Sequence, residues 1–330
     1  MKSNIIQEIN KEFEAVSKKE WLAKVTKDLK GKPFSEIEWQ LDAETTFEPI
    51  YTKEDIAGFD TGILKNYNPD WQIGEIYNGN TYLDTNQQLL EDLNHGLNAP
   101  IFNFDNVPSV NDFKMLLNKV GVKHIYLHFV GNNKDIKSNF LSFLKTENIE
   151  QKEVKVSFLS AENNIDATKF YTDKSSAKTE IQMAITEARN LLEKSENKVA
   201  LAQELTFVFY VDNTYLLSIA KLRAFKLKYV ELLQEYGLEP KLPFVYGVFA
   251  PNAYGKDEQD NLINATSMAM SAVLGGANHL IVRPTAETTT AKRLARNIQL
   301  ILKHESGLHK IADPANGSYY IESLTKELTE

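Results

Sequence analysis

Short apolar runs, rich in β-branched and aromatic residues, alternate with longer amphipathic stretches from about residue 71 onward. This alternation predicts parallel strands joined by crossover helices, and therefore an α/β fold. The predicted strands are Gln72–Tyr77, Ala99–Phe104, Lys123–Val130, Val154–Leu159, Ala167–Thr172, Leu205–Val211, Pro243–Phe249 and His279–Arg283. Eight such units in roughly 260 residues are typical of a (β/α)₈ TIM barrel.

One unit of this pattern is weak. The gap between Leu159 and Ala167 is too short for a full helix, so either neighbouring strand could be misassigned. The alternative is an open doubly wound sheet, which would carry a glycine-rich phosphate-binding turn after its first strand. No such turn is present in the sequence, and a barrel is favoured.

Residues 1–70 have a different character and are predicted to form an extended, partly helical arm. Helical spacing runs to about residue 30 and stops at Gly31-Lys32-Pro33. We expect residues 1–70 to be a subunit-interaction segment and residues 71–330 to be the barrel. The arm carries more apolar surface than a soluble monomer usually exposes to solvent, so we expect it to pack mainly on another chain. Its apolar residues are Ile5, Ile6, Ile9, Phe13, Trp21, Leu22, Phe34, Trp39 and Phe47.

Composition excludes several functional classes. The 330 residues carry a net charge of −8, which argues against a general nucleic-acid binder. The chain has no cysteine, which excludes disulfides, thiolate catalysis, iron–sulfur clusters and cysteine-ligated zinc. The N-terminal sequence is charged, without the apolar core of a secretory signal, and no run of 18 apolar residues occurs. We therefore expect a cytoplasmic protein.

The common catalytic motifs are missing as well. The sequence contains no G-x-G-x-x-G, G-x-x-x-x-G-K-[ST], H-E-x-x-H or G-x-S-x-G motif. His124 and His128 lie in a predicted strand, about 13 Å apart, too far to share a metal ion. The basic residues Lys221, Arg223, Lys226 and Lys228 are expected to form a solvated helix face.

Several stretches of the chain, taken together, resemble the methylmalonyl-CoA mutase family. They are Phe47–Asp55, Ile219–Ala224, Ala269–Ala272 with Gly275–Ala277, Leu294–Leu302, Glu305–Gly307 and Ala312–Glu322. The most specific stretch reads ADPANGSYYIE and includes Asp313, Pro314, Gly317, Ser318, Tyr319 and Tyr320. The resemblance implies a (β/α)₈ barrel that threads coenzyme A along its axis and is followed by a cobalamin-binding domain.

The resemblance also implies a cofactor. Enzymes of this family are isomerases of propionate metabolism, which interconvert methylmalonyl-CoA and succinyl-CoA and use adenosylcobalamin as cofactor. Their cobalamin domain carries a D-x-H-x-x-G motif, which this sequence lacks. We therefore expect the cobalamin domain to be absent from this chain and the chain to bind no cofactor, with adenosylcobalamin present in the holoenzyme.

Catalytic chains of the family carry polar residues at the barrel mouth that do not match here. Their Gly-Tyr-His run of the fifth strand corresponds to Lys169–Thr172, so that Phe170 and Tyr171 stand in place of tyrosine and histidine. Their His-Ser-Gln-Thr-Ser-Gly loop corresponds to Ala250–Gly255, including Asn252, and their eighth-strand histidine to Val282. Loss of a positioned hydrogen-bond donor to the reacting carbonyl typically raises the activation free energy by several kcal/mol.

These replacements predict a small, non-catalytic subunit in a heterodimer with a large catalytic mutase subunit, which would bind the acyl-CoA. The alternatives are a stand-alone acyl-CoA mutase with an altered substrate, and a scaffold or chaperone for the mutase. A barrel freed from threading coenzyme A should also have a plugged axis. The residues expected to face inward are Phe102, Phe104, Tyr126, His128, Phe207, Phe209 and Tyr246.

Overall fold

The computed structural model describes residues 16–40, 46–78, 81–131, 134–172 and 176–330. Eight parallel strands form one sheet, in the order β6-β5-β4-β3-β10-β9-β8-β7. They are β3 (Gln72–Asn78), β4 (Ala99–Asn103), β5 (Tyr126–Val130), β6 (Lys155–Leu159), β7 (Asn164–Asp166), β8 (Thr206–Val211), β9 (Phe244–Phe249) and β10 (His279–Ile281). Because the first and last strands of the series, β3 and β10, pair with each other, the sheet curls into a (β/α)₈ barrel. The predicted fold is confirmed.

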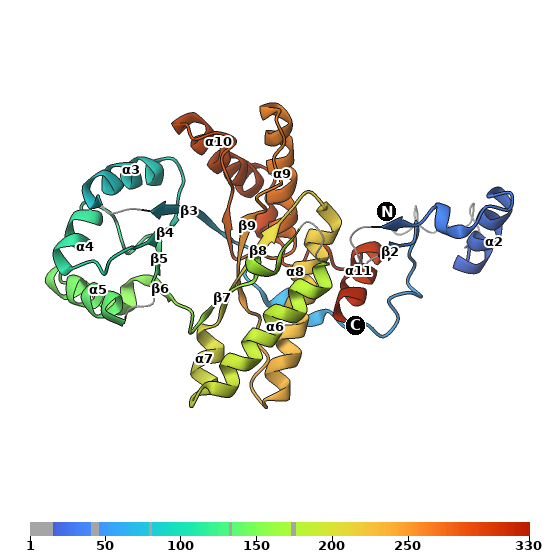
Figure 1. Cartoon of the computed structure of the whole chain (residues 1–330), viewed down its shortest axis with the longest axis horizontal. Helices are drawn as coiled ribbons and strands as arrows, with labels where there is room; N and C mark the ends of the chain where they lie inside the picture. The colour runs from blue at the N-terminus through green and yellow to red at the C-terminus, as the bar shows by residue number, and fades with distance from the viewer. Residues whose placement is uncertain (1–15, 41–45, 79–80, 132–133, 173–175) are drawn as a thin grey trace, which may run out of the picture.

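Helices surround the sheet (Figure 1). They are α3 (Tyr82–Asn94), α4 (Val110–Leu116), α5 (Lys134–Thr146), α6 (Ala177–Lys194), α7 (Lys198–Glu204), α8 (Tyr215–Glu235), α9 (Glu258–Leu274), α10 (Thr289–Leu300) and α11 (Tyr319–Thr329). Side-chain caps define where several begin: Ser109 caps α4 and Asp257 caps α9. The long helix α8 is buried almost all round because α6, α9 and α11 pack on it.

The core lies mainly between the strands and the helices. Phe207 and Phe209 of β8 pack on Phe225 of α8, with ring centroids 4.7 and 4.6 Å apart. On the opposite half, Phe129 of β5 packs on Phe140 of α5 at 4.9 Å. The prediction that Phe102, Phe104, Phe207 and Phe209 face the barrel axis is therefore wrong, since all four belong to the outer layer. Side chains alternate along a strand, and aromatic size alone does not say which face is inward.

The sheet is open between β6 and β7, which do not pair. The two strands are joined by the turn of residues 160–163, in which the Ser160 amide donates to Oδ1 of Asn163 at 2.9 Å. The strand predicted at Ala167–Thr172 is misplaced: β7 lies at Asn164–Asp166, and Ala167–Phe170 is a 3₁₀ turn. Asp166 ends the strand because its carboxylate accepts the Thr168 amide at 3.0 Å and starts the turn.

The arm has two parts. The helix α2 (Lys18–Asp28) begins with a capping box at Ser17 and has no buried residue; it lies well away from the barrel (Figure 1). The second part, which includes the short strands β1 (Trp39–Gln40) and β2 (Thr46–Phe47), runs back to the barrel. There Phe47 is 2% exposed, with its ring 5.4 Å from that of Tyr320 on α11.

The expectation that the arm packs on another chain is therefore wrong for Phe47, which lies against this chain's own barrel. Trp39 of the same part of the arm is 63% exposed. Ile5, Ile6, Ile9 and Phe13 lie outside the described residues. Of the helices that the structure describes, none combines the length and the apolar character needed to cross a membrane.

Candidate functional site

The barrel mouth is formed by the loops that follow the strands, and it brings two of the predicted positions together. The Tyr171 hydroxyl donates to Oδ1 of Asn252 at 3.2 Å. The Tyr171 ring also packs edge-on against Tyr210 at the end of β8, with centroids 5.3 Å apart. The loop after β7 is thereby joined to the loop after β9.

A second contact closes the mouth on the neighbouring side. The guanidinium of Arg283, after β10, lies 4.4 Å from the Tyr254 ring centroid and donates to the Pro251 carbonyl at 2.9 Å. The Tyr254 hydroxyl donates back to the Arg283 carbonyl at 2.5 Å. Burial raises the pKa of Tyr254 to about 12, so this phenol stays protonated as a donor. This pair was not predicted, because no local motif around Tyr254 or Arg283 marks it.

The other three predicted positions offer no polar group. Ala250 and Val282 are buried in the apolar core, and Phe170 is half-buried against the same cluster. Of the three positions where the resemblance would place imidazoles, one carries the phenol of Tyr171 and two carry the apolar side chains of Ala250 and Val282, while the amide of Asn252 stands at the glutamine position. The phenol and the amide can donate and accept hydrogen bonds, but they do not shuttle protons near neutral pH.

None of the six histidines stands at the mouth, and all six lie within the described residues. His95 and His124 precede strands, His304 and His309 follow α10, and His128 and His279 lie within the barrel. In the family the donor to the thioester carbonyl is an imidazole, so the residues at this mouth do not fit that role. Within the described residues, no group of three or more metal-ligating side chains is present.

Buried polar side chains fill the centre of the barrel. Nε2 of His128 donates to Oε1 of Gln72 at 2.8 Å, and its Nδ1 accepts from the Tyr246 hydroxyl at 2.9 Å. His279 donates through Nε2 to the Ala99 carbonyl at 2.9 Å, and the two imidazoles lie 5.0 Å apart. Burial lowers the pKa of His279 to about 4 and holds that of His128 well below its ordinary value.

The prediction of a plugged axis is thus supported at the barrel's centre, and Tyr246 and His128 face inward as expected. A cavity of about 910 Å³ reaches the barrel below this cluster, at the open seam between β6 and β7. Its walls include Ser157 and Phe244.

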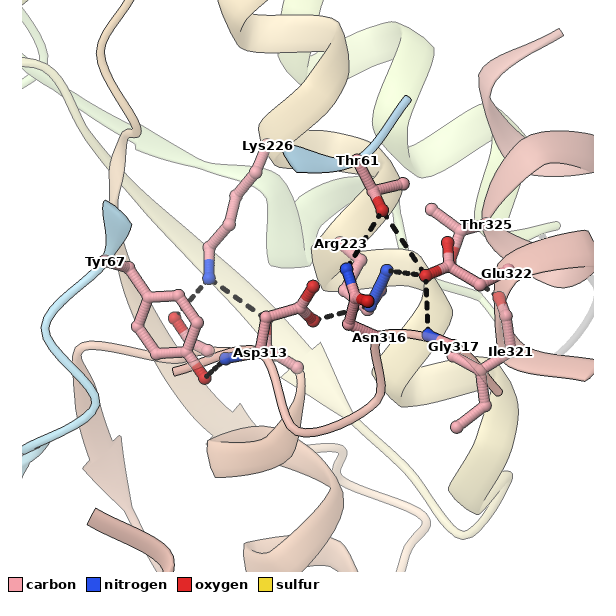
Figure 2. A network of polar contacts seen from close by, with 12 residues as sticks. Thr61, Tyr67, Arg223, Lys226, Asp313, Asn316, Gly317, Ile321, Glu322 and Thr325 are labelled. Carbon is pink, nitrogen blue, oxygen red and sulfur yellow. Dashed lines mark hydrogen bonds and ion pairs between the residues drawn. The ribbon is translucent and has the colours of Figure 1, made fainter. Parts of the chain in front are cut away.

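The family-signature stretch lies away from the mouth, in a buried network of charges (Figure 2). Arg223 of α8 pairs with Asp313 at 2.5 Å and with Glu322 of α11 at 3.0 Å, and its side chain is 2% exposed. The Gly317 amide donates to Glu322 at 3.2 Å, and the hydroxyl of Thr61, from the arm, donates to the same oxygen at 3.3 Å. The network therefore ties the arm, α8 and α11 together.

This network corrects the prediction of a solvated basic face. Lys221 is buried in an ion pair with Glu180 of α6 at 3.0 Å, and Lys226 is buried beside the arm. Nζ of Lys226 donates to the carbonyls of Gly275 and Gly276 and lies 4.6 Å from the Tyr67 ring. Burial lowers the pKa of Lys226 to about 7. The prediction failed because α8 is covered on several sides, and its charges are neutralised by partners distant in sequence.

Three of the signature positions, Asp313, Gly317 and Tyr320, shape the turn into α11 or contact the arm. Asp313 and Gly317 have positive φ values, +46° and +85°, which shape the turn that leads into α11. Tyr320 packs on Phe47 and Tyr51 of the arm. Ser318 precedes the first residue of α11, while Pro314 and Tyr319 are exposed.

Comparison with known proteins agrees with this architecture. Residues 164–330 match the family model described as methylmalonyl-CoA mutase. The chain is 25% identical to the methylmalonyl-CoA mutase small subunit of Porphyromonas gingivalis, over 97% of this chain and 62% of that protein. It is 33% identical to a methylmalonyl-CoA mutase of Rhizobium meliloti, over 51% of this chain and 26% of that protein. It is 29% identical to the large subunit of P. gingivalis, over 50% of this chain and 25% of that protein.

The chain thus spans about three fifths of the first of these relatives and about a quarter of the other two. The similarity to the small subunit includes the arm, whereas the family model covers the part from β7 onward.

Proposed function

Because the chain belongs to the methylmalonyl-CoA mutase family, we propose that it is the small, non-catalytic subunit of a heterodimeric mutase. Its partner is a large catalytic subunit that binds the acyl-CoA and adenosylcobalamin and interconverts methylmalonyl-CoA and succinyl-CoA. The observation that carries the proposal is the extent of similarity. Arm and barrel together match a small subunit, whereas the matches to the other two relatives cover about half of the chain.

The chemistry of the mouth supports the same assignment. A chain that catalyses the rearrangement needs a positioned donor to the thioester carbonyl and access to a radical cofactor. The mouth instead holds Tyr171, Asn252 and Arg283 in contacts that span the loops after β7, β9 and β10. We derive no catalytic step for this chain.

The arm supports a partner. We propose that residues 1–70 form the subunit-interaction segment and residues 71–330 the barrel. The apolar side chains of α2, including Trp21, Leu22 and Val25, are partly exposed, and the helix is tied at its start to Glu48 and Asp55 by Lys18. An amphipathic helix held by ion pairs, with its apolar side still partly exposed, is suited to bury the rest of that side on another protein.

The proposal is tested by isolating the chain from native extract at low salt and identifying its partner by mass spectrometry. We expect a stoichiometric large mutase subunit. A chain that purifies alone and converts methylmalonyl-CoA would favour a stand-alone mutase. Substoichiometric association that leaves the activity of the large subunit unchanged would favour a scaffold. Either result would overturn the proposal.

A further inference from the structure

The barrel is left open on one side, along the edge of β6. The strands β6 and β7 do not pair, and only the turn of residues 160–163 joins them, where a (β/α)₈ barrel normally has a crossover helix. Among the described residues, β6 therefore has neither a second neighbouring strand nor a helix that follows it directly.

The backbone of β6 presents hydrogen-bonding groups to this opening at every second residue. In a parallel strand, the N–H and C=O of one residue point to one neighbour and those of the next residue point to the opposite side. The Leu159 carbonyl accepts from the Gly131 amide at 3.0 Å, so Leu159 and Ser157 are bonded to β5. Val156 and Phe158 consequently face the opening.

Three of these four backbone groups have no partner in the part of the chain that the structure describes. The Phe158 carbonyl accepts from Nδ2 of Asn163 at 2.9 Å. The N–H and C=O of Val156 and the N–H of Phe158 remain unpaired. Such a row of unpaired groups on an edge strand is a template for pairing with another extended chain.

The cavity of about 910 Å³ at this opening has apolar walls on both faces of β6. Val156 and Phe158 belong to the outer face, and Leu159 and Phe244 to the inner face. Val156, Phe158 and Phe244 are only half-buried. Alternate side chains of an extended peptide along this edge would therefore meet an apolar surface on either face.

The charges in the lining do not favour an ionic ligand. The charged lining residues are Lys134, Lys137, Lys241, Glu162 and Glu204, and all five are exposed. Three cations and two anions nearly cancel, and water screens them. The cavity therefore suits an apolar, neutral chain that brings its own hydrogen-bonding backbone.

We propose that an extended apolar segment of the large subunit adds to β6 as a further strand of the sheet. In this mode of recognition, main-chain hydrogen bonds provide affinity and pockets for alternate side chains provide specificity. The inference rests on the proposed heterodimer. The large subunit is favoured as the source because Ile63 and Tyr67 of the arm also line the cavity, which makes it continuous with the proposed subunit-interaction segment.

Hydrogen–deuterium exchange at individual amides tests this, with the chain alone and in complex with the large subunit isolated from native extract. The amides of Val156 and Phe158 should exchange at least about tenfold more slowly in the complex. Those of Ser157 and Leu159, already bonded to β5, should change by less than about twofold and provide the internal control. The alternating pattern is specific to strand addition, because simple covering of the surface does not distinguish one residue from the next.

The outcomes separate this inference from the function on which it rests. If the complex forms and the amides of Val156 and Phe158 exchange as rapidly as in the chain alone, strand addition is wrong and the proposed function stands. If no complex forms, both are wrong. Slow exchange of these amides in the chain alone would assign the edge to a segment of this chain or, where it depends on concentration, to a second copy, and would contradict the large subunit as the source.

Matched variants test the contribution of one amide. Val156→Pro removes the N–H that faces the opening and leaves the bonds to β5 intact, since proline is tolerated where its nitrogen faces away from the sheet. It should weaken the heterodimer about tenfold, because a main-chain hydrogen bond is lost. Val156→Thr keeps the amide and the β-branched shape and should leave the affinity within about twofold.

Circular dichroism melts confirm that both variants fold, and the exchange measurement uses the wild-type chain and does not depend on the proline variant. Equal affinities of folded Val156→Pro and Val156→Thr for the large subunit would contradict the proposal.

Discussion

The hydroxyl of Tyr171 donates a hydrogen bond to Asn252, which lies 81 residues further along the chain. Both residues stand at positions where the resemblance to catalytic mutase chains would place polar catalytic groups. In this protein they contact each other across the mouth. The contact is exposed, so it contributes little to stability and chiefly fixes the two loops relative to one another.

Substitution at this contact should leave catalysis by the proposed heterodimer nearly unchanged. Tyr171→Phe removes the hydroxyl and keeps the ring against Tyr210, so we expect less than about 1 kcal/mol of destabilisation. Turnover of methylmalonyl-CoA by the reconstituted complex should stay within about twofold of wild type, since no transition-state contact is lost. A large fall in kcat for an intact complex would show that Tyr171 takes part in the chemistry.

The ion pairs of Arg223 should be essential for stability. Arg223→Met leaves the carboxylates of Asp313 and Glu322 buried without their cation, which we expect to cost about 3–5 kcal/mol. The loss is measured by urea unfolding.

The matched control is Lys228→Met on the same helix, whose partly exposed ion pair with Glu231 should change stability by less than about 0.5 kcal/mol. If Arg223→Met does not fold, Arg223→Lys provides an intermediate case that keeps the charge. The interpretation fails if Arg223→Met and Lys228→Met cost the same.

Acid should destabilise the barrel through its buried histidines. The folded pKa of His279 is about 4, below the ordinary value near 6.5, and the pKa of His128 is also lowered. The unfolded chain therefore takes up protons as the pH falls below about 6.5 while the folded chain does not. His279 alone costs about 2 kcal/mol by pH 5, and His128 adds to the loss.

The free energy of unfolding, measured from pH 7.5 downward, should show this slope. His128→Gln keeps hydrogen-bonding groups between Gln72 and Tyr246. Between about pH 6.5 and 5, it should reduce the number of protons taken up on unfolding by about one, and so make the unfolding free energy less dependent on pH. His95→Gln, at an exposed position, should leave the slope unchanged. If the unfolding free energies of wild type and His128→Gln fall in parallel as the pH is lowered, the lowered pKa of His128 is contradicted.

Removal of residues 1–40 should separate folding from assembly. Phe47 and the network around Thr61 remain, so the barrel should still fold, while recovery of the heterodimer should collapse. Co-expression with the large subunit followed by affinity purification measures this. Aggregation of the truncated chain alone, or undiminished pairing, would show that the first part of the arm belongs to its own barrel.

Phe47→Ala provides the complementary variant. It opens a cavity against Tyr51 and Tyr320 and should cost about 3–5 kcal/mol of barrel stability. A loss below about 1 kcal/mol would mean that the second part of the arm is not anchored to the barrel.

Periodicity predicted most of the strands because buried parallel strands are short, apolar and separated by helix-length segments. It failed at residues 167–172, where Asp166 caps a turn that the apolar residues around Phe170 obscured. It also failed for Arg223 and Lys226, because their partners lie in the arm, before β10 and beyond α10. Pairings over such distances are set by the tertiary structure and leave no local pattern.

The predicted mouth positions were partly informative. The sequence indicated which polar groups are missing, because imidazoles can be sought by residue type. It could not indicate what replaces them, since the contacts of Tyr171 with Asn252 and of Arg283 with Tyr254 depend on how three loops converge. The signature stretch was recognisable from residue types, but its role in joining Arg223 to Glu322 required coordinates.

The central claim is that this chain supports catalysis without performing it. The direct measurement is conversion of methylmalonyl-CoA to succinyl-CoA, with adenosylcobalamin, by the purified chain, by its large partner and by the two combined. We expect no turnover above background from this chain alone and full turnover from the combination. Turnover by a partner-free preparation of this chain would contradict the account.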